Sequence, residues 1–183
     1  MNKFILYPIF ALLLCQTNYN GVEVVNPCNP VDYVKIVDQI NAEVEKKISK
    51  RYRFKILLGY SKISDWLDTP LLQFQIVGPL TKEELRVLLI ETTKEFLTAI
   101  NSNEKLGPVL KKYPLPANGI DIGIRIVDKQ GVVVYDPDVF LAGVSDGKLY
   151  FHTLDEDNPF EYKTTEMEDY ETALKIVKDT STP

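Results

Sequence analysis

The chain has 183 residues, 45% of them hydrophobic and 26% charged, with a formal net charge of −5 and a pI near 5.0. This composition predicts a single folded domain with a core of ordinary size, and it excludes a disordered chain. The acidic balance excludes a nucleic-acid-binding protein, because contact with the phosphate backbone needs a basic surface.

The N-terminal residues predict an exported protein. A positively charged start precedes an apolar run over residues 4–14, and the chain then turns polar at once. This is the layout of a secretory signal peptide, and the run is too short to span a bilayer. We therefore interpret residues 1–20 as a signal peptide or lipoprotein leader, residues 21–29 as a linker and residues 30–180 as a single domain.

Two forms of the mature protein stay open. Leu12–Leu14 followed by Cys15 resembles the cleavage site of bacterial lipoproteins, whose cysteine becomes lipidated, although that motif has a small residue where Leu14 stands. Lipidation of Cys15 would anchor the chain to a membrane, whereas cleavage near residues 17–21 would give a periplasmic or secreted protein. In either case Cys28 is left without a disulfide partner.

The first half of the domain is expected to run helix, strand, strand, helix. Asn29 and Pro30 suit a helix start, and alternating apolar residues predict strands over 53–60 and 71–77. Thr81 and Glu84 then form a capping box that starts the second helix. The apolar stripes of the two helices are Val34, Val37, Ile40, Val44 and Ile48, and Leu85, Leu88, Leu89, Thr92, Phe96 and Ile100.

The second half is expected to be an antiparallel meander with a final helix. A tight turn at 128–131 and the two-residue hairpin signal Asp146-Gly147 separate short apolar runs. Thr165 with Glu168 fits another capping box, which predicts a last helix running to about residue 179. The predicted strands of this half are 120–126, 132–135, 139–144 and 148–153.

The predicted order of elements is α-β-β-α-β-β-(β)-β-α. Runs of strands interrupted by single helices are typical of an α+β domain with two layers. We expect one mostly antiparallel sheet with about three packed helices.

Two resemblances accompany this order. The order of elements, with the D-x-x-G hairpin inside residues 124–137, resembles profilin-like domains, including Cache sensors. Other motifs look like a group of short uncharacterised exported bacterial proteins, a resemblance that implies export and this fold but no activity. Those motifs are Thr81-x-x-Glu84-x-Arg86, Phe96-Leu97-x-x-Ile100-Asn101-x-Asn103, Tyr113-Pro114 and Tyr170-Glu171-Thr172-Ala173.

No pattern of residues predicts catalysis, a cofactor or a metal site. Residues 143–147 fit G-x-S-x-G around Ser145, but a nucleophile elbow needs a strand-to-helix turn, and here a hairpin is expected. His152 is the only histidine, and a pair with Cys28 would lack an orienting third group. Too few histidines and cysteines are present for a typical zinc site, and the acids over 155–171 do not have EF-hand spacing.

We therefore expect a non-enzymatic exported protein that binds a protein partner, with Trp66 and Tyr60 as the partner contacts and no membrane contact beyond a lipid on Cys15. The alternative is a small-ligand sensor or carrier, and a serine hydrolase stands third. A partner-binding domain should have an exposed apolar patch, and a ligand carrier should have a closed apolar pocket. A hydrolase should bring Ser145 and His152 into contact.

Overall fold

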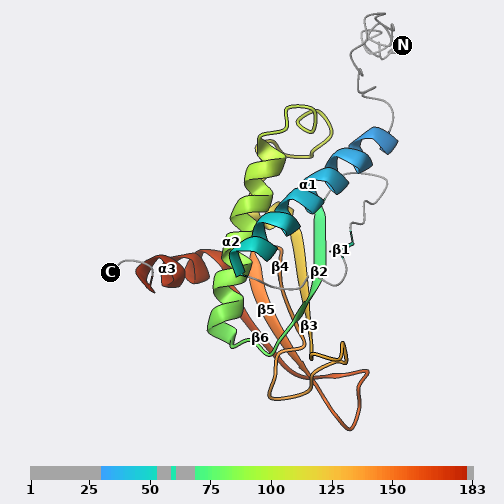
Figure 1. Cartoon of the computed structure of the whole chain (residues 1–183). Coiled ribbons are helices and arrows are strands. Elements are labelled where there is room, and N and C mark those ends of the chain that lie inside the picture. The colour runs from blue at the N-terminus through green and yellow to red at the C-terminus, as the bar shows by residue number, and fades with distance from the viewer. Residues whose placement is uncertain (1–29, 53–58, 61–68, 181–183) are drawn as a thin grey trace, which may run out of the picture.

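The computed structural model describes residues 30–52, 59–60 and 69–180, which form three helices and one six-stranded sheet (Figure 1). The predicted α+β class, with a mostly antiparallel sheet, is confirmed. In this part of the chain no helix is both long and apolar enough to cross a membrane.

The helices are α1 (Pro30–Tyr52), α2 (Lys82–Asn101) and α3 (Tyr170–Thr180), with a 3-10 turn η2 (Ala117–Gly119). The strands are β1 (Gly59–Tyr60), β2 (Leu71–Val77), β3 (Asp121–Val127), β4 (Leu141–Ser145), β5 (Lys148–Leu154) and β6 (Tyr162–Asp169).

The strands lie in the sheet in their sequence order, from β1 at one edge to β6 at the other. Every neighbouring pair is antiparallel except β2 and β3, which are parallel with Leu72 opposite Ile122. Parallel strands cannot be joined by a tight turn, so the chain must cross the sheet between them. α2 is part of that crossover and therefore lies over the sheet.

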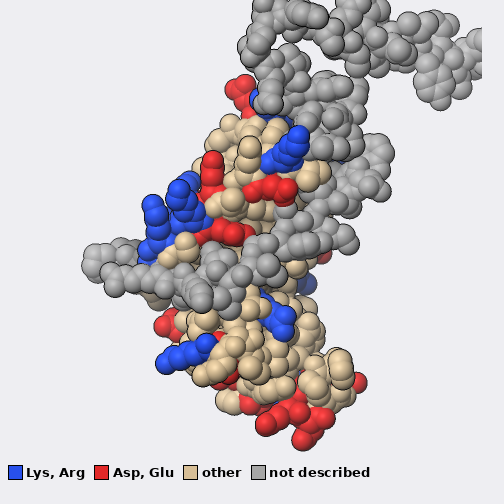
Figure 2. Space-filling view, turned by 45° about the vertical axis from the view of Figure 1, so that its right-hand side comes forward, with Lys and Arg blue, Asp and Glu red and all other residues tan. Residues whose placement is uncertain are grey.

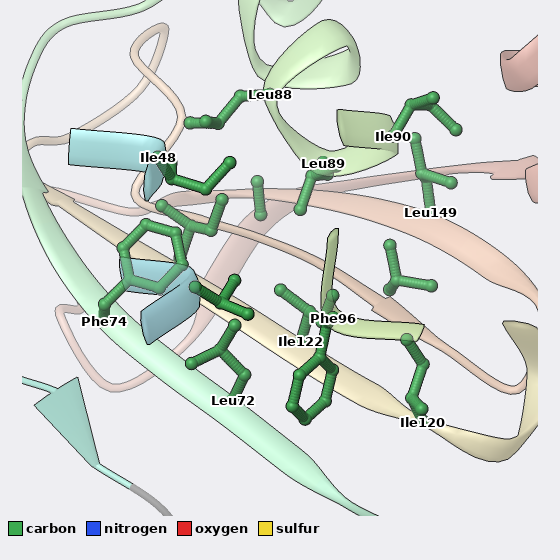
Figure 3. Close-up of a cluster of buried hydrophobic side chains, with 14 of the residues drawn as sticks. Ile48, Leu72, Phe74, Leu88, Leu89, Ile90, Phe96, Ile120, Ile122 and Leu149 are labelled. Atoms are coloured by element: carbon green, nitrogen blue, oxygen red, sulfur yellow. The ribbon is translucent and has the colours of Figure 1, made fainter. Parts of the chain in front are cut away.

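The helices pack on one face of the sheet, with α2 between α1 and α3. The side chains that β2 and β3 turn toward them, such as Leu72 and Ile122, are buried. Figure 3 shows these side chains meeting Ile48 of α1 and Leu89 and Phe96 of α2. Burial of each such side chain stabilises the fold by about 1.5–3 kcal/mol, so this layer is a major source of stability.

α2 begins as the sequence predicts. The Glu84 N–H donates to Thr81 Oγ1 at 3.2 Å, and the Thr81 N–H donates to Glu84 Oε2 at 2.8 Å, which completes the capping box. Every position of its predicted apolar stripe is buried. In α1 the predicted stripe is buried from Val37 onward, but Tyr33 rather than Val34 begins it.

The predicted start of the last helix is wrong. Thr165 and Glu168 lie in β6, and α3 begins only at Tyr170. β6 pairs with β5 along its length, and strand alternation turns Glu168 toward α2. There the Arg86 guanidinium donates to both carboxylate oxygens, from Nε at 2.7 Å and from Nη2 at 3.1 Å. These long-range contacts outweigh the local helix-start signal.

The predicted strand at 132–135 is also wrong. Its only sheet contact is a single bridge from Val133 to Val127. The position beside β3 is taken instead by the chain that leads into β4, since the Ile126 N–H donates to Phe140 O at 2.8 Å. Only one strand can pair with each edge of β3, so residues 132–135 are left outside the ladder.

The two predicted turns of this half are present. The Gly131 N–H donates to Asp128 O at 3.0 Å. Asp146 and Gly147 have positive φ angles of 48° and 71°, as a two-residue hairpin between β4 and β5 requires. Of the predicted strand at 53–60 only β1 is described, and its other residues lie outside the described chain.

The variant Glu168→Gln distinguishes a strand residue paired with Arg86 from a helix cap. Glutamine serves equally well in a capping box, so a cap would lose almost no stability. The side chains of this ion pair are only 11% and 16% exposed, so we expect the free energy of unfolding in urea to fall by about 2 kcal/mol.

Glu166→Gln is the matched control for this measurement. Glu166 pairs with Lys82 but is 62% exposed, so its loss should cost less than about 0.5 kcal/mol. If the two variants were equally stable, the pairing of Glu168 with Arg86 would not hold β6 to α2.

Candidate functional site

The sheet face opposite the helices is not covered by any helix of the described chain, and we call it the open face. Because side chains alternate along a strand, the residues between the buried ones point to this face. The register of the strands places ten of them in two rows across β2 to β6. One row is Gln73, Gly123, Gly143, Tyr150 and Met167, and the other is Gln75, Arg125, Leu141, His152 and Thr165.

Two glycines lie opposite each other at the centre of the open face, Gly123 in β3 and Gly143 in β4. A Cβ added to Gly143 would come within 2.2 Å of the Tyr150 hydroxyl, and one added to Gly123 would lie 3.2 Å from Gln73 Cγ. Burial raises the pKa of Tyr150 to about 12, and its hydroxyl donates to a backbone oxygen, that of Ile122, at 3.4 Å. The glycines therefore let Tyr150 and Gln73 lie close against the sheet.

A β-bulge brings a second tyrosine to the open face. Thr153 pairs with Thr164, but the next residue of β5, Leu154, pairs with Tyr162, so β6 has one extra residue at this point. One extra residue reverses the face to which the following side chains point. The Tyr162 ring consequently stacks on His152, with the ring centroids 4.1 Å apart and an angle of 6° between the planes.

Four neighbouring side chains of β5 and β6 lie on the open face, and we call them the β5–β6 patch: Tyr150, His152, Tyr162 and Met167. Tyr162 is 49% exposed and Met167 is 64% exposed. His152 lies 5.0 Å from the Tyr150 ring, and its Nδ1 is 2.9 Å from the Thr165 hydroxyl. Burial lowers the pKa of His152, so the patch carries no charge at neutral pH.

A hollow of about 370 Å³ lies on the open face between β2 and β4, and we call it the Arg125 hollow. The guanidinium of Arg125 lies 5.2 Å above the Phe140 ring. The residues that line the Arg125 hollow are Gln73, Phe74, Gln75, Gly123, Arg125, Phe140 and Leu141. The hollow therefore combines an exposed cation, two amides and apolar walls.

Two other hollows lie on the helical side of the molecule. One of about 330 Å³ is at the start of α2, beside Lys82 and Phe151, and one of about 600 Å³ is between α1 and the end of α2. Both are open to solvent and lined by side chains of both charge signs. Neither has the enclosed apolar shape of a typical small-ligand site.

The acidic residues do not form a metal site in the described residues. Figure 2 shows acidic side chains gathered at the lower end of the molecule, where the loops after β3 and after β5 lie in Figure 1. No group of three or more histidine, cysteine, aspartate or glutamate side chains in the described chain is placed to hold a metal ion. Two acids of β6, Glu166 and Glu168, instead pair with Lys82 and Arg86 of α2.

The partner contacts predicted from the sequence stay untested. Tyr60 lies in β1 opposite Gln73, but its side chain is outside the described residues. Trp66, Cys15 and Cys28 also lie outside the described chain. The structure therefore shows only that β1 continues the sheet on the side of the Arg125 hollow.

Ser145 and His152 are not in contact. Ser145 is at the hairpin end of β4, where it pairs with Lys148, whereas His152 is at the other end of the ladder, opposite Leu141. Four residues of a strand span about 13 Å, far beyond hydrogen-bonding distance. The contact that a serine hydrolase would need is absent from the described site.

Sequence reasoning found one half of the open face and missed the other. Alternation over 71–77 and 120–126 already separates Gln73, Gln75 and Arg125 from the buried residues. The sequence does not point to Tyr162 or Met167, because Thr165 and Glu168 predict a helix start in this segment. The hydrophobic pattern of β6 is weak, so only its pairing with β5 reveals the β5–β6 patch.

No match was found among models of known protein families, curated protein sequences or solved structures. The two resemblances described above stay predictions. The open face is the feature of this molecule from which a function can be inferred.

His152 should give the protein a specific dependence of stability on pH. Folding lowers the pKa of His152, so the unfolded chain binds the proton more tightly than the folded chain does. The free energy of unfolding therefore falls as the pH drops from about 6.5, the ordinary pKa of histidine, to the lower pKa of His152 in the folded protein. We expect His152→Gln to lose less stability than the natural chain between pH 7.5 and pH 5 in urea unfolding. Since the chain has one histidine, equal losses would show that His152 is not desolvated.

Proposed function

We propose that this protein is a non-enzymatic exported domain that binds a protein partner through the open face of its sheet. The observation that carries this proposal is the β5–β6 patch, an uncharged group of aromatic and methionine side chains on a sheet face without a helix in the described chain. The signal-peptide layout of residues 1–20 supports export, either as a cleaved protein or with a lipid on Cys15.

The composition of the patch favours a protein partner. The solvated face of an antiparallel sheet usually carries polar side chains. Tyrosine, methionine and arginine are enriched in protein interfaces, and tyrosine and arginine are among the residues that most often carry the binding energy. The open face carries all three types, in Tyr162, Met167 and Arg125, within two neighbouring rows of the sheet and the bulge beside them.

The two alternatives have less support. A small-ligand sensor or carrier would be expected to have an enclosed apolar pocket with a few polar groups, whereas the three hollows described above are open. A serine hydrolase would need the Ser145–His152 contact, which the register of β4 and β5 keeps apart. Trp66 and Tyr60 remain proposed as further contacts of the partner.

A photo-crosslinking residue at position 167 tests this proposal in the producing cell. In place of Met167 it should give one discrete adduct with a second protein, since this position lies within the proposed interface. The same residue in place of Ile176 is the matched control, because that side chain is exposed on α3, in the helical layer.

The crosslinking pattern decides whether the open face is the interface. An adduct from position 167 that is weakened by Tyr162→Ser, with none from position 176, supports the proposal. Adducts from both positions, or from position 176 alone, would mean that the open face is not the interface.

A further inference from the structure

We infer that the Arg125 hollow receives an acidic side chain of the partner protein, whose carboxylate accepts hydrogen bonds from Arg125. This inference rests on the proposed function and specifies the chemistry of the partner. No acidic side chain of the described residues forms an ion pair with Arg125.

The other described arginines are both paired. Arg51 donates to Glu91 and Glu95 of α2, and Arg86 donates to both oxygens of Glu168. Arg125 is exposed and makes no ion pair with a described residue. An unpaired guanidinium at the centre of a sheet is a natural site for a carboxylate, because its planar fork matches the two carboxylate oxygens.

The surroundings of Arg125 suit an acceptor group. Directly across the strands it faces Gln75 on one side and Leu141 on the other. Gln73 also lines the hollow, so two amide groups can donate beside the guanidinium, and no acidic residue is part of the lining. A carboxylate entering this hollow would meet donors and no competing negative charge.

Phe140 and Gly123 shape the hollow. The Phe140 ring below the guanidinium favours one orientation of its plane through a cation–π contact. Gly123 has no side chain, so the side chain of Gln73 lies over it at the level of the sheet, within the hollow that Arg125 also lines. The guanidinium of Arg125 is therefore better preorganised for a carboxylate than the amine of a lysine on a mobile loop would be.

The position of the hollow connects it to the β5–β6 patch. Arg125, Leu141 and His152 lie in one row, so Arg125 is two strand spacings from the patch, about 10 Å. A partner that covers the patch will also cover Arg125. Desolvation of an unpaired arginine would oppose binding, so a partner with an acid at this place has the advantage.

The isolated protein allows a direct test with a defined probe. Acetyl-Gly-Glu-Gly-amide is titrated into nitrogen-15-labelled protein, and the resonances of Arg125 Nε–Hε and the Gly123 amide are followed. We expect saturable shifts with a dissociation constant on the order of 10 mM, and no such shifts with the neutral acetyl-Gly-Gln-Gly-amide.

Two charge-matched variants separate a site from general electrostatics. Arg125→Gln should weaken binding of the glutamate peptide at least about tenfold, whereas Lys148→Gln removes the same charge from the same face and should leave it within about twofold. Equal effects of the two variants, or no shifts at about 50 mM peptide, would overturn the inference.

A final arm distinguishes the source of the carboxylate. If succinate bound more than about tenfold more tightly than the glutamate peptide, the hollow would be a site for free organic acids and the inference would be wrong. The titration needs no partner, so its failure can be told apart from that of the crosslinking experiment. A carboxylate site without an adduct at position 167 would refute the proposed interface alone.

Discussion

The buried residues of β2 and β3 determine the arrangement of the whole sheet. Since these strands are parallel, the chain must cross the sheet between them through α2, and Leu72, Ile122 and their neighbours are buried in one core with the apolar stripes of α1 and α2. Side chains alternate along a strand, so the same packing turns Gln73, Gly123 and Arg125 to the other face. The open face is thus a consequence of how the core is buried, and a register shift of one residue would destroy both.

β6 depends on the same helix, through charge as well as apolar packing. Glu166 and Glu168 lie on the helical side of β6 and pair with Lys82 and Arg86 of α2, and of the two only Glu168 is largely buried. Inward-pointing charges on an edge strand oppose pairing with a further strand, so they also protect this edge of the sheet. With β6 held in this way, its side chains on the other face, among them Tyr162 and Met167, extend the open face. One set of contacts therefore fixes the edge and completes the β5–β6 patch.

Local patterns in the sequence predicted the elements that depend on local physics. The capping box at Thr81, the alternation of β2 and β3 and the Asp146-Gly147 hairpin are all present, and alternation also separated Arg125 from the core. The predicted helix start at Thr165 is wrong because Thr165 and Glu168 have the spacing of a helix cap, while this segment is held as a strand by its pairing with β5 and with Arg86. Such contacts join residues far apart in the chain, and no local pattern reveals them. For the same reason the sequence could not show that Tyr162 and Met167 lie beside Tyr150 and His152.

The central claim is that the open face is accessible to a partner, and Met167 offers a direct measurement because the chain has only two methionines. With carbon-13-labelled methionine and isoleucine methyl groups, the relaxation caused by a soluble gadolinium chelate reports how near solvent approaches each methyl. We predict that the Met167 methyl relaxes several times faster than that of Ile122, which is buried in the core, and about as fast as that of the exposed Ile176. If Met167 were as strongly protected as Ile122, the open face would be covered in solution and could not be the binding surface.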